Sequence, residues 1–74
     1  MCETVVSESS PLIGKTIRAA DFRATYGAAV VAVHRGGKRV EKKIGDIVLQ
    51  PGDTLLLQVR PHFLRAYRHN TEFD

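Results

Sequence analysis

Two aspartates, Asp46 and Asp53, are the first candidates for chemistry, because each directly follows a glycine in the second half of the chain. Paired carboxylates can serve as general acid and base. Glycine, proline and aspartate are also the residues that tight turns favour, and both Gly45-Asp46 and Pro51-Gly52-Asp53 have that composition. We interpret both aspartates as turn residues and predict no catalytic residue here.

No other combination of residues supports catalysis. The serines Ser7, Ser9 and Ser10 cluster near the start of the chain, without the strand-turn-helix context of a nucleophile elbow. Residues 14–16, Gly-Lys-Thr, resemble the end of a phosphate-binding loop, but Ser9 occupies the position where that motif needs a glycine. The sequence therefore predicts that the chain is not an enzyme.

Metal binding is not indicated either. The histidines His34, His62 and His69 lack the i, i+4 spacing with which a helix presents two imidazoles to zinc. Cys2 is the single cysteine, which excludes a disulfide within the chain and fits a reducing, cytoplasmic location. We predict no metal site and no cofactor.

The charge is moderately basic, with 11 Lys and Arg against 8 Asp and Glu in 74 residues, a net charge of +3. Much of the excess lies over residues 35–43, a patch that could meet nucleic acid or anionic lipid. No aromatic residue is interleaved there to stack on bases, so we predict a solvated edge strand and no nucleic-acid partner. The alternative is a free-standing basic β module that binds nucleic acid. The basic residues are Arg35, Lys38, Arg39, Lys42 and Lys43.

Turn signals divide the chain into short strands. Pro51 and Gly52 suit the second and third positions of a type II turn, with strands predicted at 48–49 and 54–59. Gly36-Gly37 predicts a type I′ hairpin followed by a returning strand over 38–43. A first strand is expected over 3–8.

The periodicity changes to that of a helix between residues 16 and 26. Ile17, Ala20 and Ala24 recur at i, i+3 and i+7, which places them on one helical face. Thr16 is a suitable N-cap and Gly27 a suitable C′ residue. Asp21 could instead cap a second short turn, so a broken helix is the alternative.

The elements together predict an α+β fold: a small, mostly antiparallel sheet of about four to five strands, with one helix after the first strand. Pro61 can begin a short C-terminal helix. We predict a single domain over residues 1–74, with an ordered core at about 3–68 and a polar tail at 69–74.

Two apolar runs, 28–33 and 55–57, do not alternate with polar residues, which is typical of strands covered on both faces. One helix can cover one face, but a chain of 74 residues has little left to cover the other. The sequence therefore predicts a homodimer or a neighbouring domain at this surface. Both runs are much shorter than the ~20 apolar residues that cross a bilayer, and no signal peptide opens the chain. The predicted partner face consists of Val30, Val31, Val33, Leu55, Leu56 and Leu57.

Ordered pieces along nearly the whole chain resemble the TrkA C-terminal domain, also called the C-lobe of RCK regulators of potassium conductance. These pieces are residues 10–17, 22–27 and 30–35 and the Gly-Asp pairs at 45–46 and 52–53. The amino-acid sequence is especially similar to the TrkA C-terminal domains found in the cytoplasmic loops of sodium-coupled anion permeases. The resemblance implies a dimeric α+β module that regulates a membrane ion transporter from its cytoplasmic face.

The resemblance also implies a ligand site. In some members a small anionic ligand, notably cyclic di-AMP, lies across the dimer two-fold axis, held by a helix arginine and by an asparagine after an aromatic-Gly pair. The matching positions here are Arg23 and Ala29, with Ile17, Arg18 and Asp21 nearby on the helix. Ala29 departs from the pattern because it has no side-chain amide.

Overall fold

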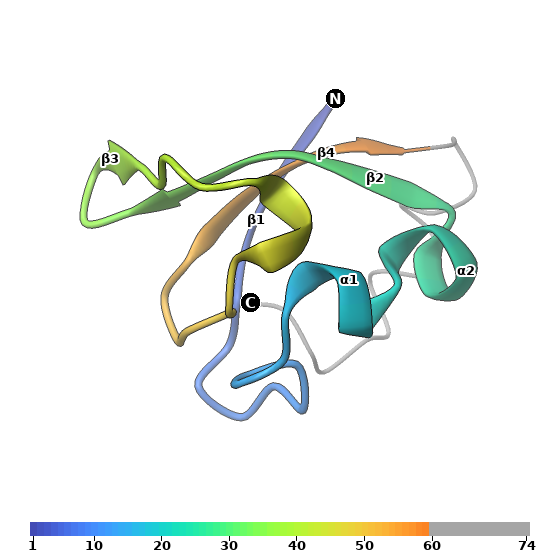
Figure 1. The fold of residues 1–74 in the computed structure, drawn as a ribbon, viewed down its shortest axis with the longest axis horizontal. Helices are drawn as coiled ribbons and strands as arrows, with labels where there is room; N and C mark the ends of the chain where they lie inside the picture. Colours follow the sequence, from blue (N-terminus) through green and yellow to red (C-terminus); the bar gives the residue numbers. More distant parts are fainter. Residues whose placement is uncertain (60–74) are drawn as a thin grey trace.

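The computed structural model describes residues 1–59, which form four strands and three short helical segments (Figure 1). The predicted C-terminal helix and polar tail lie outside the described residues. The strands are β1 (Cys2–Val5), β2 (Ala28–Arg35), β3 (Lys38–Arg39) and β4 (Thr54–Val59). The helical segments are α1 (Ile17–Ala20), α2 (Phe22–Tyr26) and the 3-10 turn η1 (Ile44–Asp46).

The strands form one antiparallel sheet in the order β1-β4-β2-β3. Figure 1 shows α1, α2 and η1 on the same side of this sheet, below β2 in that view. This arrangement confirms the predicted α+β fold, with four strands within the described residues. Strand β4, in the middle of the sheet, spans the predicted residues 54–59.

A bulge in β2 explains why residues 28–33 do not alternate. Val30 lies opposite Leu57 and Val33 lies opposite Leu55, although a regular strand would point Val30 and Val33 to opposite faces. The register shifts between Val30 and Ala32, and the extra residue, Val31, is 39% exposed. The apolar run therefore reflects a change of register in β2 as well as burial.

Asp21 breaks the predicted helix into α1 and α2, as the alternative interpretation held. Its backbone is left-handed, with φ 48° and ψ 64°, and its Oδ1 accepts a hydrogen bond from the Ala24 amide at 3.3 Å. Aspartate tolerates this conformation better than most residues because its short polar side chain can bond locally. Thr16 caps α1 through the Ala19 amide, and Gly27 ends α2 with φ 64°, both as predicted.

The segment after the Gly36-Gly37 hairpin differs from the prediction. Strand β3 covers Lys38–Arg39 only, and no strand forms at 48–49. The backbone at 47–49 pairs instead with the loop before α1, since the amides of Gly14 and Ile17 donate to the carbonyls of Leu49 and Ile47. This pairing satisfies the backbone groups without a regular strand.

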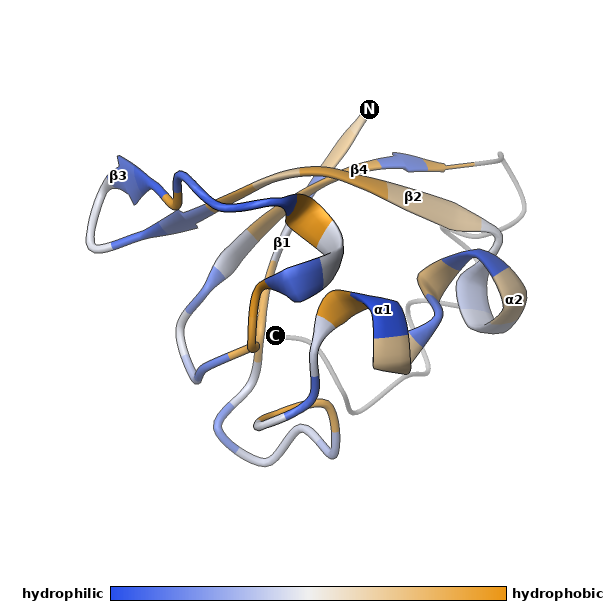
Figure 2. Ribbon diagram, in the orientation of Figure 1, coloured by the Kyte–Doolittle hydropathy of each residue, from blue (hydrophilic) through white to orange (hydrophobic). Residues whose placement is uncertain are grey.

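The hydrophobic core lies between the sheet and the helical side. Figure 2 shows hydrophobic stretches along the middle of β2 and at the start of α1, and hydrophilic ones at the β2–β3 hairpin. The core residues that are less than 2% exposed come from the loop after β1, from the segment after η1 and from β2 and β4. The hydrophobic ones are Val6, Val33, Ile47, Leu49, Leu55 and Leu57.

A partly buried ion pair joins the hairpin to the Pro51-Gly52 turn. Asp53 is fully buried, and its carboxylate accepts bonds from Nε and Nη2 of Arg35, each at 2.8 Å, and from the Gln50 amide at 2.9 Å. Arg35 Nη2 also donates to the Val48 carbonyl at 3.0 Å, and the hydrogen bond to Asp53 raises the pKa of Arg35. Asp53 is a turn residue as predicted, since its amide donates to the Gln50 carbonyl at 3.1 Å, but it also holds an arginine from another element.

We expect Asp53→Ala to lower the free energy of unfolding by about 2–3 kcal/mol, because Arg35 and the Gln50 amide lose a buried acceptor. Chemical denaturation followed by circular dichroism measures this loss. Asp46→Ala is the matched control, since it removes an aspartate from an exposed ion pair and should move the unfolding midpoint far less. Equal midpoints for wild type and Asp53→Ala would contradict a stabilising role of the Arg35–Asp53 ion pair.

Candidate ligand-binding hollow

An open hollow of about 460 Å³ lies where α1, α2, β2 and η1 meet. All five residues that the resemblance predicts for ligand binding line it, namely Ile17, Arg18, Asp21, Arg23 and Ala29. They come from three different elements and the junction between them. The structure therefore brings the predicted site residues together, and their role in binding stays a prediction.

The apolar part of this hollow is small, and buried side chains hold it in place. Ile17 and Phe22 are buried at 7% and 3% exposure, and the Phe22 ring packs 5.4 Å from that of Tyr26. Ala28 and Ala29 contribute only methyl groups from the start of β2. A flat or ring-shaped group could rest on this surface without displacing a large side chain.

The two arginines of the hollow have different surroundings. Arg18 Nη1 lies 2.7 Å from Asp46 Oδ1, in an ion pair whose side chains are 61% and 51% exposed. The exposed Arg23 makes no ion pair within residues 1–59, and it also lines a neighbouring hollow with Gly27 and Gln58. Arg23 is therefore the cation with its donors available for an anion.

Gly45 allows the Arg18 side chain to lie where it does. A Cβ atom at Gly45 would stand 2.7 Å from Arg18 Nη2 and 3.1 Å from Arg18 Cζ, so any other residue would push the guanidinium away. Neither Gly45 nor Asp46 was among the predicted site residues. Their signal in the sequence was the Gly45-Asp46 pair, which we interpreted as turn chemistry alone.

The Arg18 guanidinium lowers the pKa of Asp46 below its ordinary value of 3.8, chiefly through their hydrogen bond and then through charge attraction. The positive charges of Lys43 and Lys42 act in the same direction. Because the folded pKa is the lower one, the pair stabilises the fold above the ordinary pKa of the carboxyl. This contribution is lost as the pH falls through the folded value.

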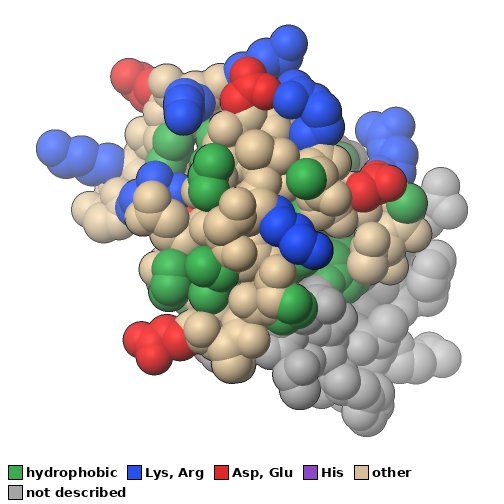
Figure 3. Space-filling model, turned by 60° about the horizontal axis from the view of Figure 1, so that its bottom comes forward, with side chains coloured by type: hydrophobic (Ala, Val, Ile, Leu, Met, Phe, Trp, Pro, Cys, Tyr) green, Lys and Arg blue, Asp and Glu red, His purple; other side chains and the backbone are tan. Residues whose placement is uncertain are grey.

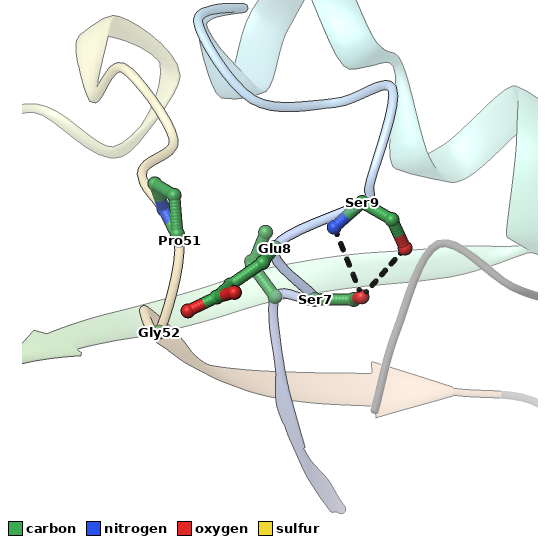
Figure 4. A pocket seen from close by; sticks show the side chains of 6 residues that line it. Ser7, Glu8, Ser9, Pro51 and Gly52 are labelled. Carbon is green, nitrogen blue, oxygen red and sulfur yellow. Dashed lines mark hydrogen bonds between the residues drawn. The ribbon is translucent and has the colours of Figure 1, made fainter.

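A second open hollow lies between the loop after β1 and the Pro51-Gly52 turn (Figure 4). The Ser7 and Ser9 hydroxyls are 3.0 Å apart, and Figure 4 shows Glu8 between the serines and the turn. Among residues 1–59, no histidine lines this hollow to activate a serine. Within residues 1–59, no group of three or more His, Cys, Asp or Glu could hold a metal ion.

The predicted partner face divides into core and surface. Val33, Leu55 and Leu57 are fully buried within this chain, and Val30 packs against the same core. Val31 is 39% exposed, and Leu56 lies on the opposite face of the sheet from Leu55 and Leu57. The side chains that remain for a partner are therefore Val31 and Leu56, beside Val5, which is 37% exposed.

Charges on the exterior are mixed. On the face shown in Figure 3, basic and acidic side chains lie near one another along the upper margin, and hydrophobic side chains form small separate clusters. The hairpin residues Lys38 and Arg39 and the following Lys42 and Lys43 are exposed. Within the described residues, no helix has the length and apolar character needed to cross a membrane.

Residues 1–70 match the family model of the TrkA-C domain, so the chain belongs to the TrkA-C domain family. This match confirms the resemblance from which the ligand-site residues were predicted. The family and the fold are those of regulatory RCK_C domains.

Relatives of known sequence include proteins of Chlamydomonas reinhardtii. The chain is 52% identical over 73 residues to a putative sulfur deprivation response regulator, and the aligned segment covers 99% of this chain and 12% of the relative. It is 47% identical over 73 residues to sodium/sulfate cotransporter 2, and the aligned segment covers 99% of this chain and 8% of the relative. The chain thus spans about a tenth of the length of these relatives.

Solved structures with the same fold include two complexes with a cyclic dinucleotide. The RCK_C domain dimer of S. agalactiae BusR with c-di-AMP has a TM-score of 0.77 and 25% identity, over 90% of this chain and 88% of that one. The KtrA RCK C domain with cyclic diadenosine monophosphate has a TM-score of 0.73 and 27% identity, over 89% of this chain and 75% of that one.

We expect the Asp46 carboxyl to titrate below pH 3.8, because the Arg18 hydrogen bond stabilises its charged form. Carboxyl carbon chemical shifts followed by NMR over a pH series measure this midpoint. Arg18→Gln should return the midpoint toward 3.8, whereas the control Arg23→Gln should not. An Asp46 titration midpoint that is the same in wild type and Arg18→Gln would show that the ion pair of Arg18 with Asp46 is absent in solution.

Proposed function

We propose that this domain is a ligand-sensing and dimerisation module of a membrane ion-transport system, carried on its cytoplasmic side. One observation carries the proposal: the five residues that the family resemblance assigns to a ligand line a single hollow. The proposal involves no catalysis. It assigns the chain a part within a longer protein, in keeping with relatives such as sodium/sulfate cotransporter 2.

The ligand class follows from the lining of the hollow. Within residues 1–59 Arg23 makes no ion pair, and its planar guanidinium fork suits a phosphate, while the apolar groups beside it suit a base or another flat ring. BusR and KtrA domains of this fold are known in complex with c-di-AMP. We therefore propose a small anionic ligand, with a cyclic dinucleotide as the first compound to test.

Ala29 sets the expected strength of binding to a cyclic dinucleotide. The resemblance implies an asparagine at this position, and the alanine methyl neither donates nor accepts a hydrogen bond. Affinity for c-di-AMP should therefore be weaker than in a domain with the amide. The hollow around Ala29 is open, so a longer side chain has room there.

The proposed dimer uses the sheet face that does not carry the helices, which would place the hollow away from the two-fold axis, unlike the arrangement that the resemblance implies. Val31, Leu56 and Val5 give this face an apolar character, and BusR supplies the precedent of an RCK_C domain dimer. Burying these side chains would compensate for the small core that one short chain can form.

Nucleic acid remains the alternative partner. BusR is also known in complex with its promoter DNA, but this chain covers only 33% of that BusR chain. The exposed lysines after β3 are the groups that would meet a phosphate backbone. Binding that weakens with salt and with Lys42→Gln plus Lys43→Gln would favour this alternative.

We expect light scattering over a dilution series to give a dimer for the wild-type domain. Val31→Glu should shift the equilibrium toward monomer, because it places a charge on the proposed interface. Val48→Glu is the matched control, since Val48 is 41% exposed but lies outside the sheet. A wild type that stays monomeric at high concentration would refute the dimer.

We expect Ala29→Asn to tighten c-di-AMP binding by about fivefold, through an added hydrogen bond. At a concentration of a hundred times Kd, the ligand should add about 2.7 kcal/mol to the stability, or a Tm increase of about 10–20 °C in a domain of this size. Thermal unfolding with and without c-di-AMP measures both effects.

Thr25→Asn, an exposed α2 position outside the hollow lining, is the control. Adenine nucleotides, divalent cations and small anions complete the ligand panel. No shift with any compound, in wild type or in Ala29→Asn, would leave the domain a dimerisation role alone.

A further inference from the structure

The ion pair of Arg18 and Asp46 occupies one wall of the proposed ligand hollow. Arg18 and Gly45 both line the hollow, and Asp46 directly follows Gly45 in η1. The pair joins α1 to η1 across 28 residues of sequence. Of the two arginines in the hollow, Arg18 is thus the one whose charge the protein itself already neutralises.

The geometry of this pair makes it exchangeable. Arg18 uses Nη1 for Asp46 at 2.7 Å, and its side chain and that of Asp46 are 61% and 51% exposed. Ion pairs in contact with water are weak and are readily replaced by another partner of the same charge. The guanidinium fork has further donors, and the backbone of Gly45 lets it lie flat beside the hollow.

The charges around the hollow are nearly balanced. Its lining contributes the cations Arg18 and Arg23 and the carboxylate of Asp21. Asp46 adds a second carboxylate next to Arg18, with Lys42 and Lys43 close enough to influence its charge. A phosphate in the hollow finds Arg23 without an ion pair in residues 1–59, and it gains Arg18 as a second cation only by displacing Asp46.

We propose that Asp46 competes with the anionic ligand for Arg18 and thereby sets the affinity of the hollow for a phosphate group. This inference rests on the proposed ligand-sensing function. In the free domain Asp46 holds the Arg18 guanidinium, and in the complex the ligand phosphate replaces the Asp46 carboxylate. The ligand class that this favours is a phosphodiester, whose oxygens can accept hydrogen bonds from both guanidinium groups.

A double-mutant cycle tests the competition. Isothermal titration calorimetry with c-di-AMP and, separately, with inorganic phosphate compares wild type, Asp46→Asn, Arg18→Gln and the double variant. Glu41→Gln is the control for net charge, because it removes the same charge from an exposed side chain outside the hollow lining. Asparagine keeps the size of Asp46 and the turn, so the fold should be retained.

Asp46→Asn should tighten c-di-AMP binding by about twofold to fivefold, with less gain for inorganic phosphate, which Arg23 can bind alone. In the Arg18→Gln background the same substitution should have no effect. An equal gain in both backgrounds, an equal gain from Glu41→Gln, or no gain would overturn the competition while leaving ligand sensing intact.

Binding by Asp46→Asn but not by wild type would support the competition and show that the native domain does not sense that compound. Absence of binding in every variant would overturn both the competition and the ligand-sensing function.

Discussion

The carboxylate of Asp53 is fully buried, and the arrangement of the second half of the chain depends on its three hydrogen bonds. Through Arg35 it fixes the end of β2, and through the Gln50 amide it fixes the turn that leads into β4. Arg35 also reaches the Val48 carbonyl and so holds the segment after η1. A buried charge is tolerated here because both carboxylate oxygens accept hydrogen bonds and the Arg35 guanidinium carries the opposite charge.

The sheet shows how a short chain distributes a limited set of apolar residues. The bulge at Val31 turns Val30 and Val33 to the same face, so β2 supplies two residues to the core where regular alternation would oppose them. The consequence is that Val31, the extra residue, is left 39% exposed. The placement of two β2 valines in the core and the exposure of a third therefore have the same origin, a single extra residue in this strand.

The features that depend on local backbone conformation could be predicted from the sequence. Gly27 and Gly52 adopt positive φ, as their turn and cap signals indicated. The prediction of a strand at 48–49 was wrong, because the segment pairs with the loop before α1 through one isolated bridge, between Val48 and Thr16. The ion pair of Arg18 with Asp46 was not predicted, because the fold alone brings together side chains 28 residues apart. The five ligand residues came from family resemblance, and no periodicity would have selected them.

The left-handed residue between α1 and α2 has a geometric effect on the arginines. In one continuous helix, Arg18 and Arg23 would point about 140° apart around the axis, since each residue turns by about 100°. The change of direction at Asp21, with φ 48°, lets both line the same hollow. A residue at 21 that prefers the right-handed conformation would favour a longer, straighter helix and separate the two cations. Convergence of charge in this domain is thus a property of one backbone dihedral.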